Sequence, residues 1–414
     1  MSELRLDWMI SCDDHIIEPP DVFTKRVPAE FLDRAPRVER IGDADFWLYE
    51  DRKQPMLGLL AAMGNPKEEW TPDPTSYDRM RKACYDPVAR LEDMDTAGII
   101  ASLCFGSVTG FCGQMFLNME DKELARHCLR AWNDWLINEF IATDPSRFIP
   151  CIQIPLWDVK LAVEEVEFWK GKGIRAVAFP ENLGQLELPT LYEKDFYWDP
   201  LWEICERENL VICMHQGTGG KRMRTAISTP EVATMAWAIG TTSSGCLLDW
   251  LFSPVFHKFP KLQIALSEGG IGWMPYFVER AHEVLNNHRY WASKGNRRID
   301  HTTQSLGEAE ENLVDFMTLD IRDLFAKHVS GCFITDEAGL AMIDIIGEDN
   351  ISVEADYPHS DSKWPNCVEH ALHQMRNLTD EQKVKVLRTN AERVYNFKVK
   401  LPEEIRPLNL EAAE

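Results

Sequence analysis

Short apolar runs alternate with amphipathic stretches of helical length along most of the chain. The runs that predict strands cover residues 99–104, 148–154, 176–179, 210–214, 262–266, 331–334 and 351–353, and one more ends at His15. The stretches that predict helices cover residues 121–140, 159–170, 200–208, 272–287, 338–346 and 379–394. This alternation predicts an α/β fold with a helix-covered parallel sheet, and eight such units favour a closed (β/α)8 TIM barrel. An open doubly wound sheet is the alternative, but no Gly-x-Gly-x-x-Gly motif follows an early strand.

One barrel domain is expected to span residues 1–397, with a long interruption after its first strand. Residues 19–90 are rich in Pro, Asp, Arg and Trp, and the segment is too long for a simple loop. Its aromatic content argues against disorder, so we expect short helices that form a cap over one face of the barrel. Residues 398–414 have the composition of an acidic tail or arm.

Composition excludes several classes of function. The 414 residues include 44 basic and 67 acidic side chains, which give a net charge of −23. Such a surface repels nucleic acid and anionic membranes. No apolar stretch reaches the length of a transmembrane helix, and the N-terminus lacks the zones of a signal peptide. The 11 cysteines are scattered without a Cys-x-x-Cys pair, which predicts reduced, buried thiols in a cytoplasmic protein.

Polar residues that can bind metal follow four of the predicted strands. Asp13 and His15 end the first, and alternation along a strand turns both toward the same face. His215, Glu268 and Asp356 end the fifth, sixth and eighth. Each residue alone also fits an ordinary structural role, such as capping a turn. Their recurrence at the end of a barrel where chemistry gathers, and the penalty for burying several carboxylates without a cation, favour a divalent metal.

The order and spacing of these residues resemble the amidohydrolase-related family typified by aminocarboxymuconate semialdehyde decarboxylase. The resemblance covers about residues 8–395 and implies a metal-dependent barrel with Asp13, His15, His215 and Asp356 as ligands. Two positions depart from the family pattern. Asp13 stands where a histidine is usual in the first-strand motif, and Glu268 replaces a usual histidine after the sixth strand.

The carboxylate-rich set is large enough for two metal ions. Its members are Asp13, His15, Glu18, His215, Glu268, Asp356 and His359. Oxygen-rich ligation favours iron or manganese over a single four-coordinate zinc. Glu354 lies on the same strand face as Asp356, and the sequence leaves open whether Glu18 or Glu354 is a direct ligand.

This departure resembles a smaller branch of the family, the nonheme diiron monooxygenases of platensimycin and platencin biosynthesis. The resemblance implies a cytoplasmic, homodimeric enzyme of secondary metabolism with two iron ions. It further implies O2-dependent hydroxylation of a coenzyme A-linked substrate, with electrons from a reductase. The alternative is a metal-dependent hydrolase or non-oxidative decarboxylase, with Glu268 or His359 as the acid/base. A third hypothesis, a degraded and non-catalytic site, is disfavoured because good ligands replace good ligands.

Basic residues follow the fifth strand. Lys221, Arg222 and Arg224 are expected on the active-site face, where they could bind the phosphates of a coenzyme A thioester. A solvated loop is the plainer interpretation. A second basic run, at residues 294–298, is an alternative anchor.

Overall fold

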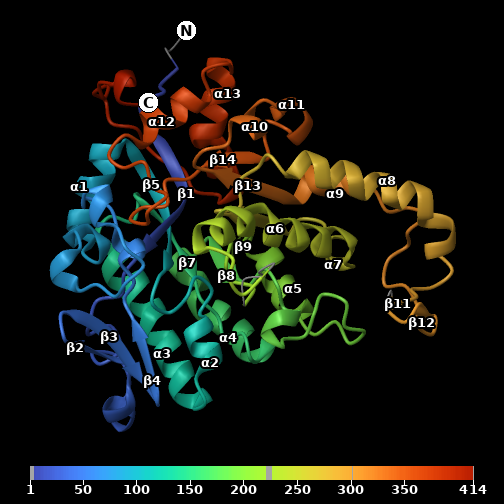
Figure 1. The fold of residues 1–414 in the computed structure, drawn as a ribbon, viewed down its shortest axis with the longest axis horizontal. Coiled ribbons are helices and arrows are strands. Elements are labelled where there is room, and N and C mark those ends of the chain that lie inside the picture. Colours follow the sequence, from blue (N-terminus) through green and yellow to red (C-terminus); the bar gives the residue numbers. More distant parts are fainter. Residues whose placement is uncertain (1–3, 221–225, 301, 414) are drawn as a thin grey trace.

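A parallel strand array forms the centre of the computed structural model, which describes residues 4–220, 226–300 and 302–413 (Figure 1). The strands are hydrogen-bonded in the orders β1-β5-β6 and β14-β13-β10-β9-β8-β7. Their bounds are β1 (Met9–Ile16), β5 (Ile99–Gly106), β6 (Phe148–Ile149), β7 (Cys151–Ile152), β8 (Ala176–Phe179), β9 (Val211–His215), β10 (Gln263–Ser267), β13 (Val329–Phe333) and β14 (Ile351–Val353). The run at residues 148–154 is split because Pro150 has no N–H to donate to a neighbouring strand. The α/β prediction is confirmed, with every predicted strand found in the order expected.

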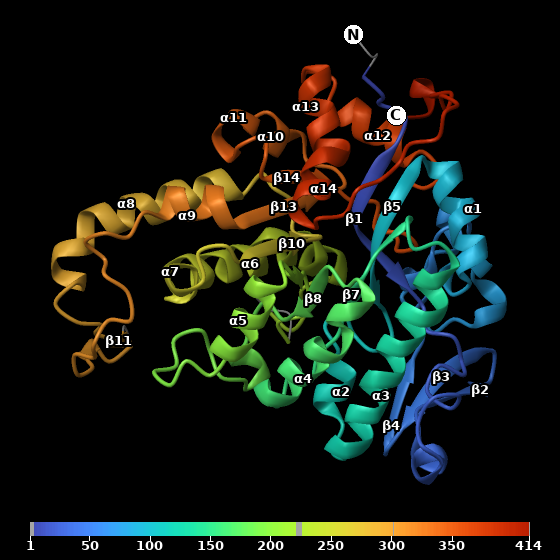
Figure 2. The same cartoon turned by 180° about the vertical axis from the view of Figure 1, so that it is seen from behind.

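Helices follow the strands and cover the outside of the array (Figures 1 and 2). They are α1 (Pro87–Ala97), α2 (Gln114–Asn118), α3 (Lys122–Trp135), α4 (Val159–Trp169), α5 (Asp199–Arg207), α6 (Glu231–Phe252), α7 (Val255–Lys258), α8 (Met274–Ala292), α9 (Ile321–His328), α10 (Glu337–Leu340), α11 (Ile343–Ile346), α12 (Cys367–Gln374), α13 (Asp380–Val384) and α14 (Asn390–Val394). The stretches named from the sequence do not include α1, α2, α6, α7, α9 or α12. The sequence pattern merged α10 with α11, and α13 with α14.

Local sequence explains where several helices begin. An aspartate side chain accepts hydrogen bonds from first-turn N–H groups at the start of α1, α3, α4, α9 and α10. These N-caps satisfy donors that have no partner within the helix. Thr379 and Gln382 form a capping box at α13. The capping residues thus fix where these helices begin.

The region at residues 19–90 contains a small sheet as well as the short helices expected. Strands β2 (Arg37–Ile41), β3 (Ala44–Tyr49) and β4 (Arg52–Pro55) form an antiparallel sheet, and single 3-10 turns flank it. The short helices were predicted, whereas the sheet was not. Along β3 the buried residues Asp45, Trp47 and Tyr49 alternate with the half-buried Phe46 and Leu48, and Trp47 is fully buried.

Two further segments leave the central body. The last turns of α8 lead to a hairpin of β11 (Ile299–Asp300) and β12 (Ser305–Leu306), which projects away from the strand array (Figures 1 and 2). The C-terminal segment folds back on the first residues, where Arg406 N donates to Asp7 and its guanidinium binds Glu369 at 2.9 Å. All 11 cysteines are buried and unpaired. Among the described residues, no helix combines the length and the apolar character needed to cross a membrane.

Candidate metal centre

Strand register brings the predicted ligands to one end of the array. Asp13 and His15 project from the same face of β1, as alternation requires. His215 is the last residue of β9 and pairs with Ser267 of β10, so Glu268 follows immediately beside it. Asp356 lies in the loop just beyond β14. Short-range strand geometry therefore explains why residues distant in sequence meet here.

Two backbone hydrogen bonds fasten the loop after β14 to β1. Asp356 N donates to the carbonyl of Asp13 at 2.9 Å, and His15 N donates to the carbonyl of Tyr357 at 2.7 Å.

Glu268 and Asp356 both have left-handed backbone conformations, with φ of 51° and 52°. Non-glycine residues pay about 1–3 kcal/mol for such conformations, which recur at functional sites. The strain turns both carboxylates toward the strand ends.

The imidazoles and carboxylates form one compact cluster. His215 Nε2 lies 3.2 Å from Asp13 Oδ2, 3.2 Å from Glu268 Oε2 and 3.1 Å from His15 Nε2. His15 Nε2 lies 3.2 Å from Asp356 Oδ1, which is also 3.0 Å from His359 Nδ1. Asp13, His15, His215 and Asp356 are fully buried.

Neighbouring groups orient the histidine rings. His215 Nδ1 lies 2.6 Å from the carbonyl oxygen of Gln216, so Nδ1 carries the proton and Nε2 presents its lone pair to the cluster. His15 stacks on His359 with 3.6 Å between ring centroids. Phe111 packs against both His15 and His215, at centroid distances of 4.6 and 4.1 Å. These contacts hold the ring nitrogens in place and keep water from the cluster.

The buried carboxylates lack donors in the part of the chain that the structure describes. Both oxygens of Asp13 and both of Asp356 are buried without a hydrogen bond. Burial, followed by repulsion from Glu354 and Asp356, raises the pKa of Asp13 well above its usual range. Burial, with Asp356 next in effect, does the same to the pKa of Glu268. Burial opposes ionisation of Asp356, but His359 and His15 hold its pKa below the usual range.

This donor set fits a divalent metal. Three overlapping triads have ligand atoms within 4.8 Å of one another: Asp13, His15 and His215; His15, Asp356 and His359; and Glu268, Asp356 and Asp361. A divalent cation supplies the charge that unpaired buried carboxylates require. Mixed oxygen and imidazole ligation suits manganese and iron, and also accommodates zinc.

Glu18 does not join this cluster. Its carboxylate accepts hydrogen bonds from Val108 N at 2.8 Å, from Thr109 N and Oγ1, and from Trp132 Nε1 at 3.0 Å. These four donors turn the side chain toward the loop after β5 and helix α3. The expectation that Glu18 binds metal is therefore corrected: the residue holds that loop against β1. Glu354 also points elsewhere, since it accepts from Glu268 N and lies 2.6 Å from Cys332 Sγ.

Two residues of the site were not proposed from the sequence. Asp361 lies in the third triad, and its place five residues after Asp356 in an acidic loop was a usable signal. Phe111 had no signal, because its contact with the histidines depends on the path of a loop. Lys221, Arg222 and Arg224 lie outside the described residues. The alternative basic run at 294–298 lies beside the projecting hairpin, away from the cluster.

A cavity of about 260 Å³ opens onto the cluster. Glu268, Asp356 and His359 form its floor, and the apolar wall comes from Leu57, Leu59, Leu60, Pro72, Phe111 and Met235. Part of the segment at residues 19–90 therefore borders the site. A small apolar molecule with one charged group fits this combination of wall and floor.

Comparison with known proteins identifies the family. Residues 29–397 match the Amidohydrolase family, and the protein belongs to it. The gamma-resorcylate decarboxylase of Polaromonas sp. (strain JS666 / ATCC BAA-500) is 23% identical over 287 residues, which cover 67% of this chain and 78% of that protein. The family resemblance inferred from the strand-end residues is thus confirmed.

Solved structures agree on the fold. An amidohydrolase from Mycobacterium avium subsp. paratuberculosis K-10 aligns with a TM-score of 0.69 and 18% identity, covering 96% of this chain and 100% of that one. A dihydroxybenzoic acid decarboxylase from Polaromonas sp. JS666, solved with manganese and the inhibitor 2-nitroresorcinol, aligns with a TM-score of 0.57 and 20% identity. That alignment covers 94% of this chain and 97% of the other.

The prediction of an O2-dependent diiron monooxygenase was wrong. The relatives named above are decarboxylases and an amidohydrolase, which agrees with the alternative instead. Two iron ions, a reductase and a role in antibiotic biosynthesis rested on the monooxygenase resemblance and have no support from these relatives. The physical error was to take carboxylates at Asp13 and Glu268 as a sign of oxygen activation. Such oxygens serve equally well as ligands of manganese, the ion bound in the Polaromonas structure.

Proposed function

We propose that this amidohydrolase is a metal-dependent, non-oxidative decarboxylase of an aromatic carboxylic acid. The observation that carries the proposal is the 260 Å³ cavity, whose apolar wall faces a floor of Glu268, Asp356 and His359. An aromatic ring suits the wall, and a carboxylate is drawn to a cation at the floor. The decarboxylases among the relatives act on ring carboxylates by name, which supports the same substrate class.

We also infer that the strands close into the (β/α)8 barrel expected from the sequence. The two backbone hydrogen bonds between the β14 loop and β1 support closure at one seam. At the other, β6 and β7 are separated only by Pro150. In a closed barrel the cluster lies at the carboxyl ends of the strands, where active sites of this fold are found.

Asp13, His15, His215 and Asp356 would hold the metal ion. When bound, the ion supplies positive charge that orients the substrate carboxylate and lowers the energy of negative charge developing beside it. His215 is held with Nε2 toward this position by its Nδ1 contact with Gln216. The chain's own contribution is therefore a preorganised set of buried anionic and imidazole side chains at the floor of a cavity.

Glu268 is placed to deliver the proton that the reaction needs. Loss of CO2 breaks the bond between the ring carbon and the carboxyl carbon, and the bonding electron pair stays on the ring carbon. A proton must then form the new C–H bond at that carbon. The Glu268 side chain is 16% exposed and lies at the cavity floor, and burial, with Asp356 next in effect, raises the pKa of its carboxyl, which favours the form that carries a proton. His359, which also lines the floor, would return a proton to Glu268 between turnovers.

Turnover in heavy water tests the proposal. Manganese-loaded protein is incubated with 2,6-dihydroxybenzoate and other hydroxybenzoates under nitrogen. We expect CO2 and arene in equal amounts, with one deuterium at the vacated carbon. Glu268→Gln should lower kcat by about 100-fold or more with its metal content retained. Asp51→Asn, an exposed change in the turn between β3 and β4, is the control. A requirement for O2, or no CO2 from any hydroxybenzoate, would refute the proposal.

A further inference from the structure

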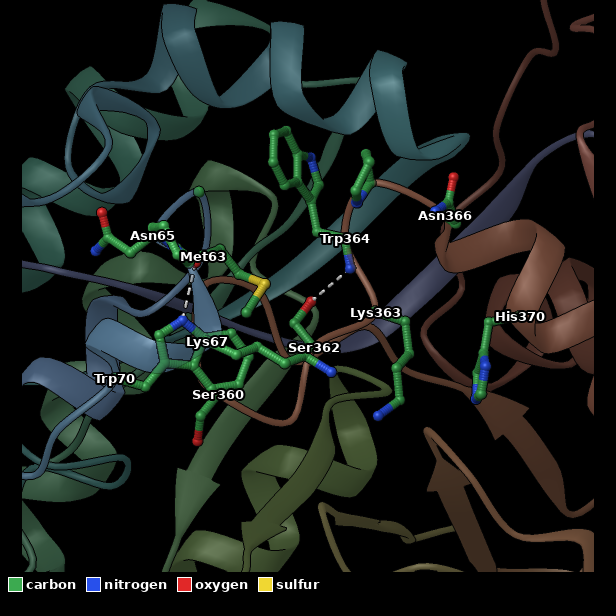
Figure 3. A pocket seen from close by; sticks show the side chains of 13 residues that line it. Met63, Asn65, Lys67, Trp70, Ser360, Ser362, Lys363, Trp364, Asn366 and His370 are labelled. Atoms are coloured by element: carbon green, nitrogen blue, oxygen red, sulfur yellow. Dashed lines mark hydrogen bonds between the residues drawn. The ribbon is translucent and has the colours of Figure 1, made fainter. Parts of the chain in front are cut away.

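A second cavity lies beside the metal centre and is separate from the apolar cavity. Its volume is about 630 Å³, against 260 Å³ for the cavity over the cluster. Two segments far apart in sequence form it, residues 63–70 and residues 360–370 (Figure 3). Its lining is polar where the other cavity is apolar, so the two are suited to different parts of a ligand.

Two lysines give this pocket a positive charge. Lys67 and Lys363 extend into it from opposite walls (Figure 3). Neither ammonium has a carboxylate at ion-pair distance in the part of the chain that is described, although the net charge of the protein is −23. On so acidic a chain, two lysine ammonium groups that share a cavity and have no carboxylate partner can together bind an anion from solution.

Neutral groups complete the walls and are held in position. Trp70 Nε1 donates to the carbonyl of Asn65 at 3.0 Å, and Trp364 Nε1 donates to the carbonyl of Asp93 at 3.0 Å. Both indoles are thereby anchored. Ser362 Oγ accepts from Trp364 N at 3.3 Å, and its side chain also hydrogen-bonds Cys367, so an anion in the pocket would compete with that thiol for the hydroxyl proton. The pocket therefore offers an O–H donor between two ammonium groups.

The loop that carries the metal-site residues connects the pocket to the cluster. Ser360 lines both the large pocket and the apolar cavity. Lys363 lines the large pocket and also a smaller cavity of about 220 Å³ that contains Glu268 and Asp361. Ser360 N donates to the carbonyl of Leu59 at 3.1 Å, which fastens the two walls together. A ligand that reaches past Ser360 can thus occupy both cavities.

We propose that this pocket binds a second oxyanion of the substrate, a carboxylate or phosphate at the end distant from the carboxylate that is lost. That the anion belongs to a substrate rests on the proposed decarboxylase function, whereas the affinity of the pocket for an anion does not. Lys67 and Lys363 pair with the oxyanion, and the hydroxyl of Ser362 donates to it. The substrate class becomes an aromatic acid that carries a second, tethered anionic group.

Direct binding of inorganic phosphate to the manganese-loaded protein is the first test. Because Trp70 and Trp364 line the pocket, saturable quenching of tryptophan fluorescence should report binding, and calorimetry gives the affinity. We expect Lys67→Ala and Lys363→Ala each to weaken phosphate binding by about tenfold. Lys172→Ala, which removes an exposed lysine remote from the pocket, should leave the affinity unchanged. No saturable binding in the wild type, or equal affinity in all four proteins, would overturn the proposal.

Kinetics separate a substrate subsite from a site for a free anion. One substrate is 2,6-dihydroxybenzoate, and the other is the same ring with a propionate chain. The lysine variants should raise KM about tenfold for the propionate compound alone, and phosphate should compete with that compound alone. Phosphate that changes turnover of plain dihydroxybenzoate would instead make the site regulatory and overturn the substrate assignment. If neither compound is decarboxylated, the proposed function fails, while the phosphate titration still decides whether the pocket binds an anion.

Lys363 could instead serve to stabilise the charge of Asp361, and the same variants test this alternative role. Its charge opposes the burial and the Asp356 charge that raise the pKa of Asp361. If neutralising Asp361 were its function, Lys363→Ala would alter manganese affinity and leave phosphate affinity unchanged. The proposal requires the opposite pattern, and Lys67→Ala, on the far wall, should reproduce it.

Discussion

Replacing Asp361 by asparagine should have opposite effects on the metal-free and the manganese-loaded protein. The ligand oxygens of Glu268, Asp356 and Asp361 lie within 4.8 Å of one another. Two unit charges at 4.8 Å repel by about 3.5 kcal/mol at an effective dielectric constant of about 20. Burial, and then the charge of Asp356, raise the pKa of Asp361, whereas His359 and His15 hold the pKa of Asp356 below its usual range, so the repulsion considered is that between Asp356 and Asp361. Since Asp361 is partly exposed, we halve the repulsion to about 2 kcal/mol.

Thermal and chemical denaturation measure this effect. Without metal, Asp361→Asn should raise the free energy of unfolding by about 2 kcal/mol, which is a rise in Tm of a few degrees for a chain of this length. With saturating manganese the gain should vanish or reverse, because the cation attracts the carboxylate that the variant lacks. Asp51→Asn makes the same chemical change on an exposed turn, and its effect should stay within about 0.5 kcal/mol in both states.

The difference between the metal-free and the manganese-loaded protein tests whether a cation relieves the repulsion at Asp361. A fall in stability without metal would mean that Asp361 is held by favourable contacts, and the reasoning from repulsion would be refuted. An equal gain with and without manganese would show repulsion at Asp361 that no cation relieves, which would place the metal elsewhere.

Three further outcomes follow from the site. Glu18→Gln should destabilise the protein by about 2–4 kcal/mol, because the amide N–H₂ replaces one of the two oxygens that accept from the four donors and then faces a donor itself. Metal analysis should nevertheless find unchanged manganese content, and loss of metal would restore Glu18 as a ligand. Burial raises the pKa of Glu354 to about 7 from a usual 4.5. Between these values the folded metal-free protein keeps a proton that the unfolded chain has lost, so stability should fall by about 3 kcal/mol as pH rises from 4.5 to 7. Denaturation curves at pH 5 and 7.5 should show a smaller fall in stability for Glu354→Gln than for the wild type, while the raised pKa values of Asp13 and Glu268 leave a slope in both proteins. Removal of metal by a chelator should lower Tm. Manganese at about 100 times its Kd should restore about 2.7 kcal/mol of unfolding free energy, and a Tm that does not respond to manganese would refute the metal site.

Much of the site could be predicted from where apolar runs end. Asp13 and His15 lie near the end of β1, His215 ends β9 and Asp356 follows β14, and parallel strands bring their carboxyl ends to the same side of a sheet. The chemistry was predicted less well. The sequence names the ligand types, but oxygen-rich ligation is compatible with manganese as well as iron, and the choice between lyase and oxygenase activity came from the relatives.

Local sequence patterns did not predict the positions of two acidic loop residues. Glu18 was expected at the metal because it follows the β1 ligands closely, yet donors from Val108, Thr109 and Trp132 turn it away. Asp361 was passed over, although it lies within ligand distance of Asp356. In both cases the decisive contacts join residues far apart in the chain, so no local pattern contains them.

By itself, the sequence determined the order of the strands and the set of candidate ligands at their ends, because side-chain alternation and burial act over a few neighbouring residues. Only the tertiary structure decided which acids face the cluster, how Phe111 closes it, and that Lys67 and Lys363 share a pocket. Those arrangements depend on how loops cross the ends of the strands. That path is set by long-range hydrogen bonds, such as the one from Ser360 N to the carbonyl of Leu59.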